Sequence, residues 1–194
     1  MGVVASCLAL DCFAYGQTYP SLHEVRVDGL PSLMARTNEP SDVLLTSLDT
    51  IFHDREICCG KDSAIEDSVL RADPKSLKDV ATRLQGRHLL SNGRPAMVTA
   101  ESIEPDKLTS GLLIPALRDK HALLMEWNSR LYVLYGATYR RDYDADTGGE
   151  LYTVLTLLLL DTRFSDSRRE VVFNRETDDW GKIQAFVYLE AKPQ

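Results

Sequence analysis

The sequence predicts a single α+β domain in which helices from the first half of the chain pack on an antiparallel β-sheet from the second half. The chain has 194 residues, of which 44% are hydrophobic, which is enough for one well-filled core. Apolar residues recur at helical spacing between residues 41 and 112, whereas β-branched, aromatic and apolar runs separated by turn residues fill the chain from residue 121 onward. Helices that precede strands in this way are typical of α+β folds.

Residues 1–16 are expected to form a signal segment, and residues 17–194 the domain. The segment is mostly apolar from Val3 to Tyr15 and ends in Ala14-Tyr15-Gly16, a small-x-small pattern typical of cleavage sites. We therefore expect a bacterial protein that is secreted or periplasmic, or a cytoplasmic one if the segment instead belongs to the domain. No other stretch reaches the roughly 18 apolar residues that span a bilayer, so no integral membrane segment is expected in the mature chain.

The region before the third predicted helix contains an extended arm and two helices. Prolines break residues 17–40 into short pieces, which predicts an arm that lies over the domain. Near-helical apolar spacing predicts a helix over residues 41–52, with Ser41 or Asp42 as its N-cap. A second helix is predicted over residues 58–70.

Two further helices follow. Asp73 is the predicted N-cap of a third helix over residues 74–86. A short fourth helix is predicted to begin at Glu104-Pro105, and Gly111 and Pro115 are expected to limit its length.

The strands are predicted from apolar and β-branched runs and the turns between them. Asn128-Ser129 is the predicted turn of the central hairpin, and the later strands are expected to form an antiparallel meander. The predicted strands are residues 95–99, 121–127, 130–139, 151–160, 170–173 and 183–189.

The net charge of the chain argues against polyanionic partners. It contains 22 basic and 29 acidic residues, which gives a net charge of −7, and it has no cluster of Lys and Arg. Nucleic acid and anionic membrane surfaces are therefore not expected as partners. The sequence leaves the oligomeric state open.

The adjacent cysteines Cys58 and Cys59 are the strongest candidates for chemistry. Neighbouring cysteines bridge each other only through a strained ring, and removal of the signal segment would leave them as the chain's two free thiols. A cysteine at a helix N-terminus has its thiolate stabilised by free backbone N–H groups, which makes it nucleophilic. A histidine on a facing strand, such as His121, could act as its base and then as an acid. Burial of both as ordinary core residues is the alternative.

Several segments between about residues 50 and 140 form one ordered pattern. They are Cys59-Gly60-Lys61-Asp62-Ser63-Ala64-Ile65, the strand at residues 92–98, and the strand that begins at His121 with its partner, at 121–124 and 132–136. This pattern resembles the papain-like cysteine peptidases, and most closely their bacteriocin-processing branch, in which the first segment opens the catalytic helix. The resemblance implies a papain-like layout, Cys59 as nucleophile, His121 as base, a peptide or protein substrate, and no cofactor.

The chain departs from this family pattern at two positions. The family usually has a Gln six residues before the nucleophile to bind the oxyanion, and here that position is His53, whose N–H could donate the same bond. The family also places an Asn or Asp opposite the histidine, where this chain has Gly136 or Ala137. Thr138 and Asp142 lie near if the register slips, and Asp161 is expected at the opposite end of the sheet. The third catalytic member is unassigned, so a non-catalytic binding or interaction domain on the same scaffold is the alternative function.

The acidic loop at residues 142–150 is a candidate calcium site. Its alternating carboxylates suit Ca²⁺, but its glycine and its twelfth position do not match an EF-hand loop, so a solvated hairpin loop is the favoured interpretation. Adjacent cysteines are poorly spaced to chelate one zinc ion. No metal ligand is therefore assigned.

Overall fold

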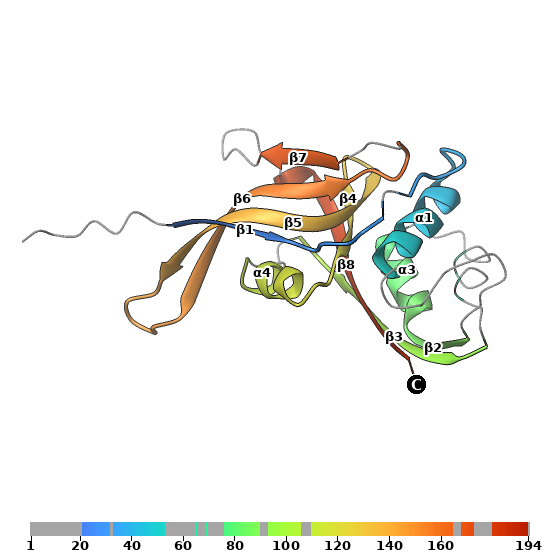
Figure 1. The fold of residues 1–194 in the computed structure, drawn as a ribbon, viewed down its shortest axis with the longest axis horizontal. Coiled ribbons are helices and arrows are strands. Elements are labelled where there is room, and N and C mark those ends of the chain that lie inside the picture. Colours follow the sequence, from blue (N-terminus) through green and yellow to red (C-terminus); the bar gives the residue numbers. More distant parts are fainter. Residues whose placement is uncertain are drawn as a thin grey trace, which may run out of the picture.

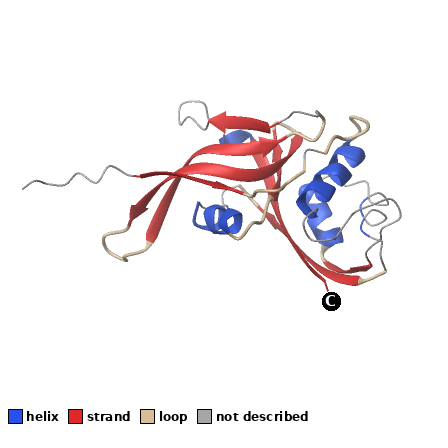
Figure 2. Ribbon diagram, viewed as in Figure 1, coloured by secondary structure: helices blue, strands red, loops and turns tan. Residues whose placement is uncertain are grey.

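The computed structural model describes residues 21–31, 33–52, 65, 69, 76–89, 93–105, 110–164, 168–172 and 180–193. Its helices are α1 (Pro40–Phe52), α3 (Leu77–Leu84) and α4 (Ser110–Arg118), with a short 3₁₀ turn at Trp180–Lys182. Its strands are β1 (Ser21–Arg26), β2 (Gly86–Leu89), β3 (Pro95–Ile103), β4 (Leu123–Trp127), β5 (Arg130–Tyr143), β6 (Glu150–Leu160), β7 (Arg168–Val172) and β8 (Ile183–Pro193). The predicted α+β class is confirmed (Figure 2).

One antiparallel sheet contains all of these strands. Its order is β2-β3-β8-β4-β5-β6-β7, and β1 pairs with β5. Strands β4 to β7 form the predicted meander, but the last strand returns to the middle of the sheet between β3 and β4, so the meander prediction is wrong there. A central place suits β8 because its consecutive residues Phe186 and Val187 are both fully buried, and a strand buried on both faces needs neighbours on both edges.

The sheet opens into two arms around α4 (Figure 1). Strands β1, β5 and β6 run toward one end of the molecule, whereas β8, β3 and β2 run toward another. Helix α4 packs against β1, β5 and β6, whereas α3 packs on β3 and β8, and α1 on β5. The core includes Leu48 and Phe52 of α1, Leu84 of α3, Leu117 of α4 and Phe186 of β8.

Helix α4 differs from its prediction. It covers Ser110–Arg118 and contains both Gly111 and Pro115, which were expected to limit a helix that began near residue 104. Leu113, Ile114 and Leu117 are each 1% exposed or less. Burial of three such side chains contributes about 1.5–3 kcal/mol each. This outweighs the cost of about 3 kcal/mol for the proline and about 1 kcal/mol for the glycine.

Two strands were not predicted. Strand β1 forms within the segment expected to be an extended arm without a strand of its own, and β2 follows α3 after one residue. Gly86, expected to cap that helix, instead begins β2 with a φ of 128° that a side chain would strain. In the described region the N-cap of α3 is Ser76, whose side chain accepts a hydrogen bond from Asp79 N. Asp73 lies outside the described residues.

Candidate functional site

The structure describes one of the three predicted site residues. His121 is described, whereas Cys59 and His53 lie outside the described residues, as does Cys58. Ile65 and Val69, which follow Cys59 along the chain, are helical and almost completely buried in the core. The predicted pairing of Cys59 with His121 therefore stays a prediction.

The end of α4 fixes the backbone of His121. His121 N donates to Ala116 O at 2.9 Å, and Lys120 N donates to Leu117 O at 3.1 Å. Lys120 has a φ of 62°. These two bonds around a left-handed residue form the Schellman arrangement that ends many helices, although glycine usually takes the left-handed position. His121 is thereby held at a defined point between α4 and β4.

The side chain of His121 lies against β8. It is half-buried, and its ring centroid lies 5.1 Å from that of Tyr188, with an interplanar angle of 57°. Tyr188 also lines a cavity of about 330 Å³ between α4 and the sheet, which we name the α4 cavity. Its lining residues are Glu101, Ser102, Ile103, Leu112, Ala116, Leu123 and Tyr188. His121 thus contacts one wall of a cavity large enough for a side chain.

The position expected opposite His121 is occupied by another strand. The hairpin register is as predicted, with Trp127 opposite Arg130 and Leu123 opposite Leu134. Beyond Leu134, however, β1 replaces β4 along the edge of β5, and Arg26 lies opposite Gly136. The predicted placement of His121 opposite Gly136 is therefore wrong.

No side chain fits at Gly136. A Cβ atom there would lie 2.7 Å from Val25 O and 2.8 Å from Leu158 Cδ1. Ala137 is fully buried, and Thr138 instead shares a hydrogen bond with Thr156. This part of β5 supplies no Asn or Asp that could orient an imidazole.

Asp161 belongs to a separate cluster. Its carboxylate is fully buried and accepts hydrogen bonds from Arg163 Nε at 2.7 Å and Arg163 Nη2 at 2.6 Å. These bonds raise the pKa of the Arg163 guanidinium. The guanidinium also lies 5.5 Å from the ring centroid of Tyr132. Asp161 therefore positions Arg163. Among the described contacts, none joins Asp161 to His121.

The loop after β6 is joined to α1 by buried hydroxyls. Thr162 Oγ1 and Ser47 Oγ lie 3.1 Å apart, and Ala35 N donates to Thr162 O at 2.7 Å. A second cavity, of about 240 Å³, lies between α1, α3 and the β4–β5 turn, and Arg163 is among its lining residues. The Asp161–Arg163 pair thus stands at a junction of three elements.

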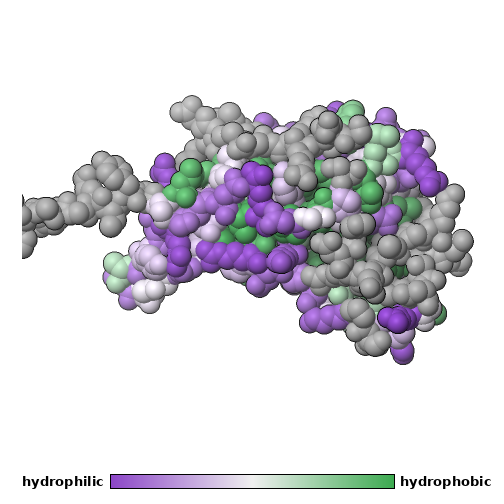
Figure 3. All heavy atoms as spheres, in the orientation of Figure 1, coloured by the Kyte–Doolittle hydropathy of each residue, from purple (hydrophilic) through white to green (hydrophobic). Residues whose placement is uncertain are grey.

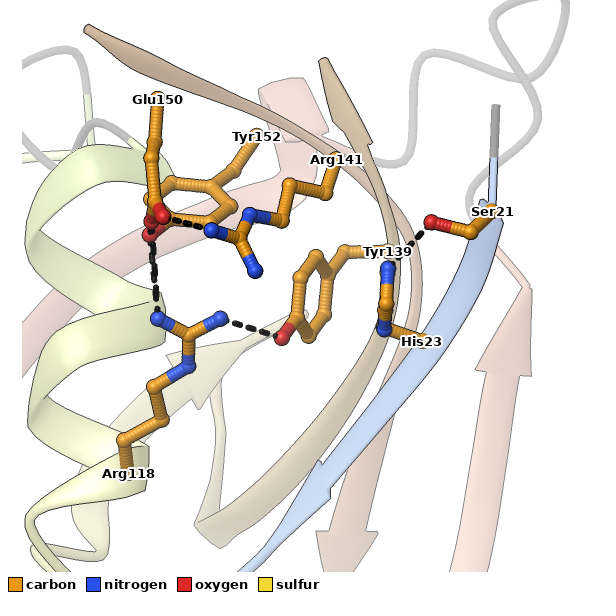
Figure 4. A network of polar contacts seen from close by, with 7 residues as sticks. All are labelled: Ser21, His23, Arg118, Tyr139, Arg141, Glu150 and Tyr152. Carbon is orange, nitrogen blue, oxygen red and sulfur yellow. Dashed lines mark hydrogen bonds and ion pairs between the residues drawn. The ribbon is translucent and has the colours of Figure 1, made fainter. Parts of the chain in front are cut away.

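A polar network joins α4 to the β5–β6 hairpin (Figure 4). Arg118 Nη2 donates to the Tyr139 hydroxyl at 2.8 Å, and Arg118 Nη1 donates to the Tyr152 hydroxyl at 3.1 Å. Glu150 accepts from Tyr152 and Arg141, and it lies 3.6 Å from Arg118. The Tyr152 hydrogen bond, followed by the charges of Arg141 and Arg118, lowers the pKa of Glu150.

This network could have been found by matching the two strands. Tyr139 and Arg141 are two residues apart on β5, as are Glu150 and Tyr152 on β6, so each pair points to one face of its strand. Hydrophilic residues cover much of the surface over this part of the molecule (Figure 3). Arg118 of α4 contacts two tyrosines and a carboxylate of the β5–β6 hairpin, so the network holds the hairpin against α4.

In the acidic loop, the Asp144 carboxylate accepts hydrogen bonds from the loop's own backbone. Asp144 Oδ1 accepts from Asp146 N at 2.9 Å and from Thr147 N at 3.4 Å. The backbone hydrogen bond from Asp146 lowers the pKa of Asp144 most. Within the part of the chain that is described, no group of three His, Cys, Asp or Glu residues is arranged to hold a metal ion.

Comparisons with known proteins identify no relative. No family model, no curated protein and no solved structure matches this chain. No described helix has both the length and the apolar character needed to cross a membrane.

Proposed function

We propose that this protein is a papain-like thiol hydrolase that cleaves a peptide or amide bond with Cys59 and His121. The observation that carries the proposal is the position of His121, which is held by the end of α4 with its ring against Tyr188, a residue that lines the α4 cavity. The sequence order of a Cys-Gly helix opening followed by a histidine before a strand adds to it. The papain-like arrangement of the helices and sheet is part of this proposal.

In the proposed reaction, Cys59 Sγ attacks the carbonyl carbon while His121 takes the thiol proton. The C–N bond breaks as His121 returns that proton to the leaving amine, which leaves an acyl group on Cys59. Water, deprotonated by His121, then releases the acid and restores the thiol. The Cys59 backbone N–H and the His53 ring would stabilise the oxyanion.

The proposed catalytic unit is a Cys–His dyad. Because Arg26, and not His121, lies opposite Gly136, the position where the family's third member was expected does not face His121. In a serine-type triad, the third group orients and stabilises the histidine. Here the Schellman bond from His121 N and the Tyr188 ring would position the imidazole instead.

The same observation at Gly136 supports a second candidate function. A scaffold in which the described part of β5 near Gly136 supplies no Asn or Asp suits a non-catalytic binding or interaction domain with structural cysteines. The two functions differ in whether turnover requires Cys59 and His121.

Hydrolysis of a mixed peptide library, followed by mass spectrometry, tests the proposal. We expect cleavage by the wild-type protein, its loss in Cys59→Ala and His121→Ala, and its retention in the matched control Cys58→Ala. Cleavage that survives both substitutions would contradict the dyad. If no peptide or simple amide is cleaved while peptides still bind, the binding domain is favoured.

A further inference from the structure

We infer that the α4 cavity binds the apolar side chain of a peptide's N-terminal residue, and that Glu101 at its rim binds the free ammonium group of that residue. The inference rests on the proposed function in one respect, namely that a bond near His121 is cleaved. The binding event itself depends only on the cavity and its rim.

The cavity walls select an apolar group. Ile103, Leu112, Ala116, Leu123 and the ring of Tyr188 supply its apolar surface, and Ser102 and Glu101 supply its polar groups. Its volume of about 330 Å³ is at the small end of the range for ligand sites in proteins. A single large aliphatic or aromatic side chain suits this space better than an extended ligand.

Glu101 supplies a negative charge at the rim. Its side chain is exposed, and no described residue forms an ion pair or hydrogen bond with its carboxylate. By contrast, Glu24, Glu150 and Glu190 pair with Arg26, Arg141 and Lys192, respectively. A carboxylate beside an apolar cavity complements a ligand with an apolar body and a cationic end.

The sheet register sets the separation of the two ends of the site. Glu101 lies opposite Tyr188, and Tyr188 lies opposite Leu123, so the three residues form one row across β3, β8 and β4. Adjacent strands are about 4.8 Å apart, so Glu101 and Leu123 are separated by roughly 10 Å between Cα atoms. His121 precedes Leu123 by two residues. About three peptide residues, at about 3.5 Å each, would connect an ammonium at Glu101 to a carbonyl near His121.

This arrangement predicts a preference for unblocked peptides with an apolar first residue. An acetylated N-terminus lacks the charge that Glu101 would bind, and a glycine lacks the side chain that would fill the cavity. Because Glu101 is exposed, its contribution to affinity should be modest and should weaken with salt.

Binding of three small probes tests the inference. Leucinamide, N-acetyl-leucinamide and glycinamide are titrated by NMR at pH 6 in low salt, where an α-amino group is protonated. The Cys59→Ala variant is used so that no turnover interferes. We expect leucinamide to bind about fivefold more tightly than N-acetyl-leucinamide. Glycinamide should give no measurable binding.

Matched variants separate the cavity from the rim. Glu101→Gln should abolish the preference for leucinamide and leave binding of N-acetyl-leucinamide unchanged, whereas Asp142→Asn should change neither. Leu112→Trp should block both leucine probes. Leu151→Trp is its control, since Leu112 and Leu151 are 54% and 52% exposed. Circular dichroism checks that each variant is folded.

The outcomes distinguish this inference from the proposed function. Equal binding of the two leucine probes, or a preference that persists in Glu101→Gln, would overturn the inference. So would the absence of binding by leucinamide. Any of these three results would leave Cys59- and His121-dependent hydrolysis standing, because that reaction is measured separately with longer peptides.

Discussion

Asp161 and Arg163 form a buried ion pair in which each charge compensates the other. The Asp161 side chain is 0% exposed and that of Arg163 is 16% exposed. Removal of one partner leaves the other charge without compensation in a poorly solvated place, which typically costs 3–5 kcal/mol. Arg163 lines a cavity and could regain some solvation, so the lower end of that range applies.

We therefore expect Asp161→Ala to lower the free energy of unfolding by about 3 kcal/mol, measured by urea denaturation. Glu24→Gln is the matched control, because Glu24 pairs with Arg26 at the surface and such pairs contribute about 1 kcal/mol or less. Equal losses from the two substitutions would contradict the role assigned to burial.

Glu150 should show a depressed pKa that depends on Tyr152. A carboxyl group with a lower pKa in the folded state stabilises the fold fully above its unfolded pKa of about 4.3. That stabilisation is lost as the pH falls through the folded pKa. We expect the network around Arg118 to weaken only under acidic conditions.

A carboxyl NMR titration tests this expectation. Tyr152→Phe should raise the pKa of Glu150 toward its ordinary value, since the Tyr152 hydrogen bond is the main cause of the shift. Tyr143→Phe is the control, because the described contact of Tyr143 is through its ring, which lies 5.2 Å from the Arg141 guanidinium. An unshifted Glu150 in the wild-type protein would rule out the network in solution.

At the residue scale, the sequence identifies chemical types more readily than partners. His121 stands out as a histidine before an apolar strand, and the structure holds it beside Tyr188. The residue opposite Gly136 could not be predicted, because Arg26 reaches it from more than a hundred residues away in the chain. The contacts of Arg118 with Tyr152 and Glu150 could not be predicted, because they require α4 to pack against the hairpin.

At the scale of elements, the end of α4 controls the position of His121. Lys120 has a left-handed backbone, a conformation that costs a side-chain residue roughly 1–2 kcal/mol relative to the usual one. Lys120→Gly should therefore raise the free energy of unfolding by about 1 kcal/mol. Urea denaturation measures the change, with Lys182→Gly as a control outside this motif. A loss of stability in Lys120→Gly would show that α4 ends differently.

The junction of β1 with β5 makes a second prediction. Gly136→Ala places a Cβ against the backbone carbonyl of Val25. That carbonyl cannot move without disturbing the strand pair, so we expect a loss of about 1–3 kcal/mol. Faster hydrogen exchange at Val27 N, which donates to Tyr135 O, would report the loosened strand.

Gly149→Ala is the control for this substitution. Its nearest neighbour is the Thr147 hydroxyl at 3.2 Å in the exposed hairpin loop, where a small shift is cheap. Equal effects of the two glycine substitutions would contradict the close approach of β1 to β5.

Strands and helices with strong local patterns could be predicted from the sequence, but long-range order could not. The Asn128-Ser129 turn and the buried apolar runs of β5 and β6 identify these strands. Strand β8 lies between β3 and β4 because both of its faces are buried. A short apolar run in the sequence looks the same whether one face or both faces of the strand are buried. Pro115 misled the prediction of α4, because local propensity opposes a helix that burial stabilises.

At the scale of the whole molecule, the α4 cavity lies where the sheet opens around α4. The two arms of the sheet diverge around α4 (Figure 1). The α4 cavity is lined by residues of α4, β3, β8 and β4. His121 lies at the same junction, between α4 and β4. The proposed hydrolase thus draws its base and its cavity from one structural feature, whereas its nucleophile comes from the segment after α1.

The reactivity of Cys59 tests this proposal most directly. Iodoacetamide labelling at each cysteine is followed by peptide mass mapping from pH 5 to 9 in the wild-type protein, in His121→Ala and in the control His23→Ala. We predict rapid labelling of Cys59 at mildly acidic pH, at least about tenfold slower labelling in His121→Ala, and no change in His23→Ala. Labelling that begins only near the free-thiol pKa of about 8.5, or that does not depend on His121, would contradict the proposal.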